Sequence, residues 1–288
     1  MNFEQFISAM IEHVKDRLCE ETLVERQEIL KNNGVRLVGI SIRPEGEMAA
    51  PIIYMEEYYA KYCEGASIEM LSEHLLEVFK ELPALPVYDF EEFFDFEKIK
   101  YRIVYKLINA KKNAKLLKKV PNLPMFDLAI VFYVVVSVED YESCSILIRN
   151  EHMNEWKLPI SILYQYAKNN TPRIFPYMMK PLEEMFEERA FDVIPESSLI
   201  VLTNRKNVNG ASVLLYPNMP KIIFDYVGKN YYLLPSSIHE FLIVPADEFI
   251  NPLKLKEMVR DVNAHLVDRE EFLSDHIYYF NGENITEM

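Results

Sequence analysis

The residues that could do chemistry lie closest together between positions 234 and 245, in the sequence LPSSIHEFLIVP. Two serines, a histidine and a glutamate fall within five positions there, and these are the residue types of a hydrolase triad. In such a triad the imidazole contacts the serine through one ring nitrogen and a carboxylate through the other. The first question is therefore whether Ser237, His239 and Glu240 can meet in this way.

The apolar residues that follow predict that this stretch enters a buried β-strand, and a strand separates the three groups. Successive side chains of a strand point to opposite faces, so Ser237 and His239 share one face while Glu240 lies on the other. A tight turn would restore the contact, but no GxSxG sequence or nearby glycine pair indicates an oxyanion hole. Ser237 and His239 stay as the catalytic candidates, and the alternative is a turn-capping serine beside a locally bonded histidine.

A second distinctive stretch is the basic segment, residues 98–119, which contains nine Lys or Arg residues and no acid. Nine of the 31 bases of the chain lie here, which leaves 22 against 45 acids elsewhere. A basic patch of this kind on an acidic protein can bind phosphate or an acidic partner. The candidate partner-binding residues are Lys106, Lys111, Lys112 and Lys115.

Two other interpretations of the basic segment remain open. Residues 110–119 can form a solvated helix that turns Leu116 and Leu117 inward and its lysines outward. Alternatively, the bases can pair with the acidic run just upstream, residues 89–97. Both interpretations make the segment structural.

The sequence predicts neither a metal site nor a bound cofactor. The remaining histidines are scattered, and no two lie four residues apart as on a zinc-binding helix: His13, His74, His152, His265 and His276. The chain has only seven glycines, whereas dinucleotide and P-loop sites need clustered glycines so that the backbone can approach phosphate.

The elements that must position these residues follow a loosely repeated order of paired strands and a helix. Residues 22–30 and 35–43 flank Asn33-Gly34, which can adopt the positive φ of a tight hairpin. Similar units follow after residue 126, with a strand expected at 211–217. Because tight hairpins connect only antiparallel neighbours, we predict an α+β fold with mixed, mostly antiparallel sheets built from hairpin-plus-helix units.

The predicted domain boundary lies at residues 83–97, which begin with two prolines and continue as an acidic, aromatic run without a clean period. This linker would separate an N-terminal α+β lobe, residues 1–82, from a larger C-terminal α+β lobe, residues 98–288. In the first lobe, helical periodicity appears at 67–82, where Ser67 is the expected N-cap and Met70 belongs to the apolar stripe.

Net charge, the length of the apolar stretches and the spacing of the cysteines narrow the classes of protein to which this chain can belong. The net charge of −14 makes the average surface repel phosphate backbones, so nucleic-acid binding is not expected, although the basic segment leaves it open. The apolar stretches fall short of the roughly 20 residues that span a membrane, and the N-terminus lacks the features of a signal peptide. Three widely separated cysteines predict reduced, packed thiols: Cys19, Cys63 and Cys144. We expect an acidic, cytoplasmic protein.

Several stretches together resemble a known family: KNNGVRLVGISIR, APIIYMEEYYAKYCEG, LTNRKNVNGASVLLYP and LPSSIHEFLIVPAD. The family that they resemble is an uncharacterised domain family of unknown function from anaerobic Gram-positive gut bacteria, and the resemblance runs over nearly the whole chain. It implies a bacterial cytoplasmic origin and one family-length unit. Since that family has no established activity, the resemblance implies no catalytic residue.

Three functional hypotheses follow. The favoured one is a non-enzymatic binding or regulatory protein that engages another macromolecule through the basic segment or through clefts between the lobes. The second is a hydrolase-like enzyme in which Ser237 or His239 works with a distant carboxylate such as Asp127 or Asp247. The third is a nucleic-acid-associated protein that acts through the basic segment, with an affinity that falls steeply with salt.

Overall fold

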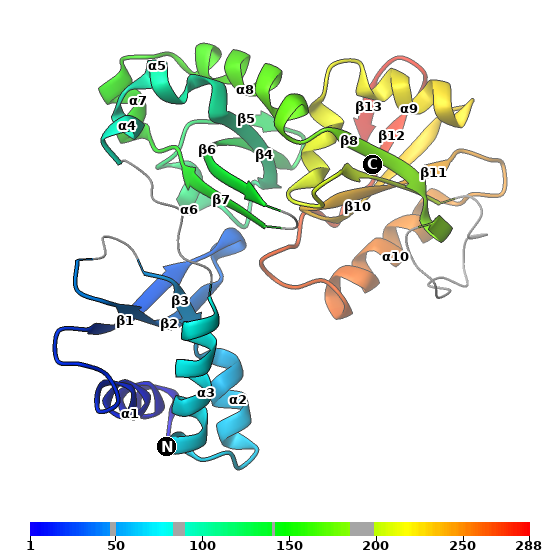
Figure 1. The fold of residues 1–288 in the computed structure, drawn as a ribbon. Coiled ribbons are helices and arrows are strands. Elements are labelled where there is room, and N and C mark those ends of the chain that lie inside the picture. The colour runs from blue at the N-terminus through cyan, green and yellow to red at the C-terminus, as the bar shows by residue number, and fades with distance from the viewer. Residues whose placement is uncertain (47–49, 83–89, 140–141, 185–198) are drawn as a thin grey trace. The chain divides into compact units, whose positions relative to one another are not determined.

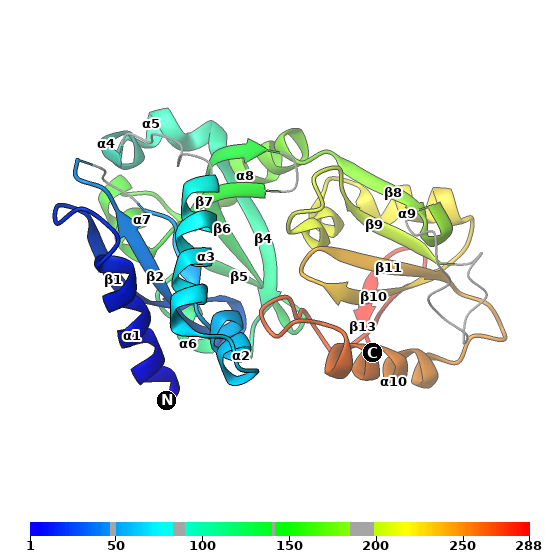
Figure 2. The ribbon, with the colours of Figure 1, turned by 60° about the horizontal axis from the view of Figure 1, so that its bottom comes forward.

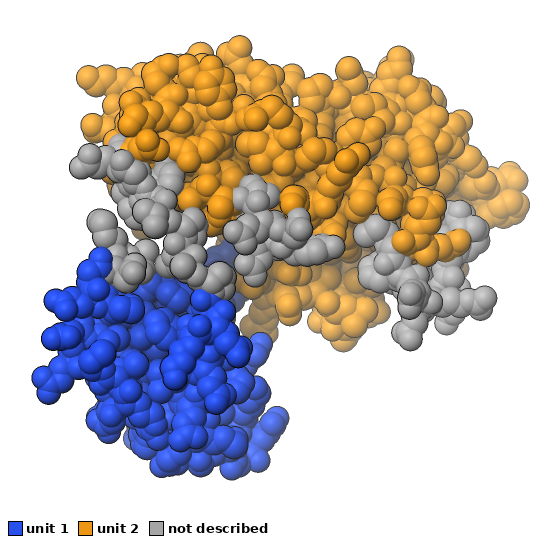
Figure 3. Space-filling model, in the orientation of Figure 1, with its two compact units in different colours: residues 1–87 blue, residues 88–288 orange. Residues whose placement is uncertain are grey.

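A computed structural model of the chain describes residues 1–46, 50–82, 90–139, 142–184 and 199–288. The chain divides into two compact units, residues 1–87 and residues 88–288 (Figure 3). Of the predicted linker, residues 83–89 lie outside the described residues, and residues 90–97 form α4, the N-cap Asp95 and the start of α5 in the second unit.

Unit 1 is a three-stranded antiparallel sheet in the order β1-β2-β3, with three helices (Figure 1). Its elements are α1 (Phe3–Lys15), β1 (Leu23–Leu30), the 3-10 turn η1 (Asn32–Gly34), β2 (Arg36–Arg43), β3 (Ile52–Tyr54), α2 (Glu56–Cys63) and α3 (Ile68–Glu81). The predicted hairpin is confirmed, because Asn33 and Gly34 take φ values of 59° and 72° between β1 and β2. Alternate β2 residues pack against α1 and α3 on one face of the sheet.

Helix α3 begins as its sequence predicts and buries a slightly different face. The Ser67 hydroxyl accepts the backbone N–H of Met70 at 3.2 Å, which confirms the N-cap. Met70 itself is 56% exposed, so its assignment to the apolar stripe is wrong. The buried stripe of α3 runs instead through Ile68, Leu71 and Leu75, because these side chains face the sheet and α1.

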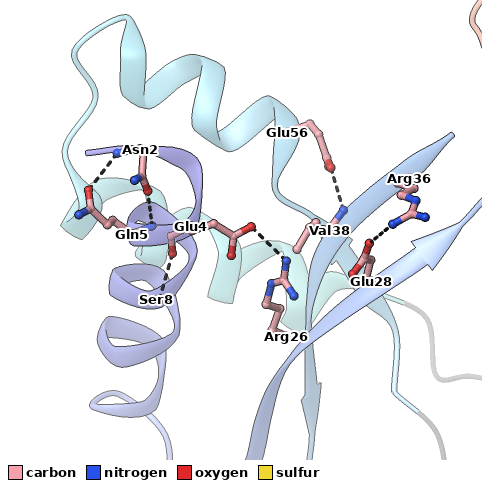
Figure 4. A network of polar contacts seen from close by, with 9 residues as sticks. All are labelled: Asn2, Glu4, Gln5, Ser8, Arg26, Glu28, Arg36, Val38 and Glu56. Carbon is pink, nitrogen blue, oxygen red and sulfur yellow. Dashed lines mark hydrogen bonds and ion pairs between the residues drawn. The ribbon is translucent and has the colours of Figure 1, made fainter.

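Polar contacts join the helices of unit 1 to its sheet (Figure 4). Arg26 on β1 donates to the Glu4 carboxylate of α1 at 3.2 Å. The Glu56 carboxylate accepts the backbone N–H of Val38 at 2.8 Å, next to the β2–β3 pairing. Asn2 and Gln5 form a capping box at the start of α1.

Unit 2 contains two sheets. Its first half comprises α4 (Phe90–Phe94), α5 (Phe96–Ile99), η2 (Lys100–Arg102), β4 (Ile103–Asn109), α6 (Ala114–Leu117), β5 (Asn122–Met125), β6 (Leu128–Glu139), β7 (Glu142–Leu147), α7 (Asn150–Trp156) and α8 (Ile160–Ile174). Its second half comprises β8 (Tyr177–Pro181), η3 (Leu182–Glu184), β9 (Ile200–Asn204), η5 (Gly210–Leu215), α9 (Met219–Val227), β10 (Tyr231–Ser237), β11 (Glu240–Pro245), α10 (Pro252–His265), β12 (Tyr278–Phe280) and β13 (Ile285–Glu287).

The smaller sheet is centred on β6, which pairs with β4 along one edge and with β5 and then β7 along the other. The larger sheet has the order β13-β12-β10-β11-β9-β8. Every strand pairing within the described residues is antiparallel. The predicted α+β class with mostly antiparallel strands is therefore confirmed.

One apolar core joins the two sheets of unit 2. Phe132 of β6, Leu202 of β9 and Ile243 of β11 are fully buried in it, together with residues of α8, η5 and α9. Each such side chain stabilises the fold by about 1.5–3 kcal/mol. Helix α10 covers the opposite face of the larger sheet through Leu255 and Val259, so α9 and α10 lie on its two sides (Figure 2).

Three further features bear on the predictions. Residues 211–217 do not form the expected strand, because residues 210–215 coil into η5 and bury most of their side chains in the core.

The cysteines are free, as expected, but all three are exposed, so the prediction of packed thiols is wrong. Among the described residues, no helix combines the length and apolarity that crossing a membrane requires.

Candidate functional site

The basic segment folds as several short elements. Its first residues complete α5 and form η2, residues 103–109 form β4, and α6 is only one turn long. Leu116 and Leu117 pack against the apolar cluster of Ile108 and Val131. The inward-facing leucines of the predicted helix are present, but the helix covers only Ala114–Leu117.

The bases at the start of the segment have acidic partners. Lys98 and Arg102 lie 3.5 and 3.7 Å from carboxylate oxygens of Glu92. Lys100 lies 2.5 Å from Glu97, and this contact raises the pKa of Lys100. Pairing with the upstream acids, which the sequence left open, therefore accounts for this part of the segment.

The bases at its end differ, and we call them the lysine cluster: Lys111, Lys112, Lys115, Lys118 and Lys119. All five are exposed, and within the described residues no acidic side chain forms an ion pair with them. Their backbone is held firmly by two amide side chains. Asn113 donates to the Asn109 carbonyl at 2.9 Å, and Asn122 donates to the Leu117 carbonyl at 2.8 Å.

Two of the predicted partner-binding lysines lie over aromatic rings. The Lys106 ammonium is 4.2 Å from the centroid of the Tyr133 ring, and the Lys112 ammonium is 3.6 Å from that of Phe272. Lys106 lies on β4 and is only partly exposed, whereas Lys112 is exposed. A ring face attracts a cation without neutralising it, so both lysines keep their charge.

Residues 234–245, which contain Ser237 and His239, form a hairpin and not a single strand. β10 ends at Ser237, β11 begins at Glu240, and these two residues pair across the turn. The Ser237 hydroxyl accepts the backbone N–H of His239 at 3.0 Å, and Ser236 donates to the Glu240 carboxylate at 3.1 Å. The strand alternation expected for residues 237–239 is therefore wrong, because the chain reverses there.

The imidazole of His239 faces two other segments. Nδ1 lies 3.0 Å from the Asn207 carbonyl oxygen and 3.2 Å from the Asn209 nitrogen, while Nε2 lies 3.5 Å from a carboxylate oxygen of Glu271. A ring that carries its proton on Nε2 accepts from Asn209 and directs that proton toward Glu271. Gly210 allows this packing, since a Cβ there would lie 2.3 Å from the His239 carbonyl oxygen.

The two carboxylates considered as distant partners of His239 bond to other groups. Asp247 accepts from the Phe249 N–H and from the Lys229 ammonium, at 3.4 and 3.3 Å. These contacts, the Phe249 N–H first, hold the pKa of Asp247 below its usual range. Asp127 accepts from two hydroxyl groups beside β12. Among the described residues, the carboxylate that forms an ion-pair contact with His239 is that of Glu271, which no spacing in the sequence marked.

The segment between α10 and β12, residues 266–277, links the hairpin to the loop after β4. The Glu271 carbonyl accepts the N–H of Ile238 at 2.8 Å, and the Leu273 carbonyl accepts the Asn109 side-chain amide at 2.9 Å. These contacts run through backbone groups of one connecting segment. They brace the loops against each other, and the His239–Glu271 pair sets two titratable side chains face to face.

Comparison with known proteins identifies one relative group. A family model described as a family of unknown function (DUF5688) matches residues 3–282, nearly the whole chain. The resemblance to an uncharacterised domain family is thereby confirmed. No curated protein and no solved structure matches the chain.

Proposed function

The chain belongs to the family of unknown function DUF5688, and we propose that it is a non-enzymatic, cytoplasmic binding protein whose lysine cluster holds an acidic protein partner. The observation that carries this proposal is the contrast inside the basic segment. Its first bases have acidic partners, whereas the five lysines of residues 111–119 have none within the described chain. The free, exposed thiols fit a reducing compartment.

The lysine cluster suits binding because its charges are concentrated and its backbone is fixed. Five exposed ammonium groups lie within nine residues of a chain whose net charge is −14. Isolated surface ion pairs contribute only about 0–1 kcal/mol each, but several charges on one patch act together on a complementary surface. Since amide hydrogen bonds already order this backbone, little backbone entropy is lost when a partner binds, and the entropic cost falls on the lysine side chains.

An acidic protein segment fits this patch better than a nucleic acid. The rest of the chain carries 22 bases and 45 acids, so a long phosphate backbone would run from an attractive patch into a repulsive surface. A short acidic segment needs to meet only the cluster itself. The proposed partner is accordingly a protein with a cluster of Asp and Glu side chains.

The test replaces three lysines of the cluster by Glu in the tagged, full-length chain: K111E, K112E and K115E. A matched control makes the same change of charge at exposed lysines of α8, β8 and α9: K168E, K180E and K221E. We expect quantitative pull-downs from a lysate of the source cell to lose the captured partner with the first triple variant only, while thermal unfolding shows both variants folded. Capture that survives in the cluster variant, or is lost equally in both, contradicts the proposal.

A nuclease-treated arm of the same pull-down separates the two kinds of partner. Capture that survives nuclease supports an acidic protein. Capture that nuclease abolishes, with an affinity that falls steeply between low and physiological salt, replaces this proposal by nucleic-acid binding.

A hydrolase is the second candidate, and the His239–Glu271 pair is the observation that favours it. A carboxylate beside an imidazole supports general-base catalysis, and the ring could then activate the Ser237 hydroxyl or a water. The ring would first have to release Asn207 and Asn209 from Nδ1, because its other nitrogen faces Glu271. Hydrolysis of a p-nitrophenyl ester by the full chain tests this candidate: rates at least tenfold lower in H239A support it, and unchanged rates in H239A contradict it.

A further inference from the structure

Three residues far apart in the sequence bring metal-ligating atoms together beside β12. Asp127 lies in the two-residue turn between β5 and β6, His276 precedes β12, and Glu287 lies on β13. One ligand atom from each residue lies within 4.8 Å of the other two. The closest pair is His276 Nδ1 and a carboxylate oxygen of Glu287, at 2.5 Å. No other group of this kind occurs among the residues that the structure describes.

The register of the larger sheet explains why these side chains meet. Tyr278 of β12 pairs directly with Glu287 of β13, and directly paired residues direct their side chains to the same face. His276 precedes Tyr278 by two residues, which places it on that side of an extended chain. The Tyr278 hydroxyl in turn reaches Asp127, at 2.5 Å. Strand pairing therefore brings His276 and Glu287 together, and side-chain hydrogen bonds join Asp127 to them.

The carboxylate of Asp127 is held by groups around it. One of its oxygens accepts from Tyr278 and the other accepts from the Ser274 hydroxyl at 2.7 Å, which leaves each oxygen a further lone pair. The Tyr278 hydroxyl is the donor in its contact with Asp127, because an ionised carboxylate only accepts. Ser274 also accepts the backbone N–H of His276 at 2.9 Å. Metal-ligating carboxylates and imidazoles are commonly oriented by such outer partners.

The residue before Asp127 has a left-handed backbone conformation. Phe126, which precedes Asp127 in the turn, has a φ of 54°. A bulky residue in the left-handed region costs about 1–2 kcal/mol, and two-residue hairpin turns commonly require a positive φ at their first residue. The Phe126 ring packs against Tyr278, with centroids 5.2 Å apart, yet 43% of Phe126 remains exposed. The turn that carries Asp127 is thus in contact with β12 through this pair of rings.

We propose that Asp127, His276 and Glu287 form a binding site for a divalent transition-metal ion of the zinc type. One imidazole nitrogen and two carboxylate oxygens are ligands that zinc takes, at about 2.0–2.2 Å, whereas calcium and magnesium prefer oxygen alone. Two carboxylates balance the charge of the ion. The His276 and Glu287 side chains are 39% and 32% exposed, which leaves access for the ion and for water at its remaining position.

The geometry explains why the sequence predicted no metal site. Local spacing detects ligands that share one helix or one turn, but these three come from separate strand ends and turns. Asp127 and Ser274, which bond to each other, are 147 residues apart.

The test is calorimetric titration of the full-length chain, stripped with EDTA, with zinc chloride. We expect one saturable zinc ion per chain and an affinity at least tenfold lower in D127N, H276A and E287Q. The matched control is H265A, which removes the imidazole of another exposed His–carboxylate pair, His265–Asp261 on α10. Its zinc affinity should equal that of the unaltered chain, and magnesium chloride should bind more weakly than zinc.

Two outcomes overturn the proposal. If the unaltered chain shows no saturable zinc binding, the His276–Glu287 contact is an ordinary ion pair that closes the β12–β13 hairpin. If H276A and E287Q bind zinc as tightly as the unaltered chain, the ion binds elsewhere. E287Q separates folding from binding, because its amide can still hydrogen-bond to His276 while the ligand charge is gone.

Discussion

Two Ser-x-His turns in unit 2 share a local structure and differ in what surrounds them. In Ser237-Ile238-His239 and in Ser274-Asp275-His276, the serine hydroxyl accepts the histidine N–H, at 3.0 and 2.9 Å. Each imidazole has a glutamate beside it, Glu271 at 3.5 Å and Glu287 at 2.5 Å. The two histidine side chains are similarly exposed, at 31% and 39%. Neither the motif nor the exposure distinguishes them.

The difference lies in the group that contacts or approaches each imidazole in addition to the serine and the glutamate. His239 has Nδ1 against backbone atoms of Asn207 and Asn209, so its two nitrogens already face protein groups and the ring braces the loop before η5. His276 has instead a second carboxylate nearby, that of Asp127, whose oxygens keep lone pairs. The imidazole of His239, which backbone atoms surround, stabilises a loop. The imidazole of His276, which a second carboxylate approaches, is a candidate metal ligand.

The largest difference in stability between the two regions is expected from one alanine placed in each. At Gly210 a Cβ would lie 2.1 Å from the Thr203 hydroxyl and 2.3 Å from the His239 carbonyl oxygen, so G210A should cost about 3 kcal/mol by overpacking. At Gly282, in the β12–β13 turn, the nearest atom is 3.5 Å away, and G282A should cost about 1–2 kcal/mol for its positive φ alone. Urea unfolding of the full chain measures both.

The distinction between the packed region around Gly210 and the open turn at Gly282 fails if G282A destabilises the chain as much as G210A. That result would mean that the loop before η5 yields readily and that His239 is not held in a packed setting. A cost of under about 1 kcal/mol for G210A would have the same meaning.

Smaller effects should separate the two imidazoles. H239A leaves the Asn209 N–H without its ring acceptor and should cost about 1–2 kcal/mol, whereas H239N should recover part of this because its amide oxygen can accept instead. H276A removes a partly exposed contact between His276 and Glu287 and should cost less than about 1 kcal/mol. Zinc chloride should raise the unfolding temperature of H239A but not that of H276A. Equal zinc responses in both variants would remove the distinction.

Sequence reasoning succeeded where the determining interactions are local. Asn33-Gly34 turns the β1–β2 hairpin because these residues tolerate positive φ, and Ser67 caps α3 through a bond to a residue three positions on. It failed at residues 211–217, where burial on all sides of η5 replaces the alternation that marks a strand. Met70 was misplaced for a related reason, since periodicity identifies a stripe only to within one residue or so.

The candidate sites show the same contrast between local features, which the sequence reveals, and long-range contacts, which it does not. The charge reversal of residues 98–119 is visible in the sequence, but only the folded chain separates bases with acidic partners from the five lysines without them. The turn-capping role of Ser237 was one of the alternatives that the sequence left open, and the structure places its hydroxyl on the His239 N–H. Glu271 has no local signal at all, because its relation to His239 depends on the path of the α10–β12 segment.

By itself, then, the sequence determined the Asn33-Gly34 hairpin, the Ser67 cap and the position of the basic segment, because the backbone preferences, hydrogen bonds and charges involved span only a few residues. Tertiary structure alone decided which carboxylate faces each imidazole and which lysines stay unpaired. Strand register and core packing bring Asp127 to Ser274 across 147 residues, and no local spacing encodes that contact.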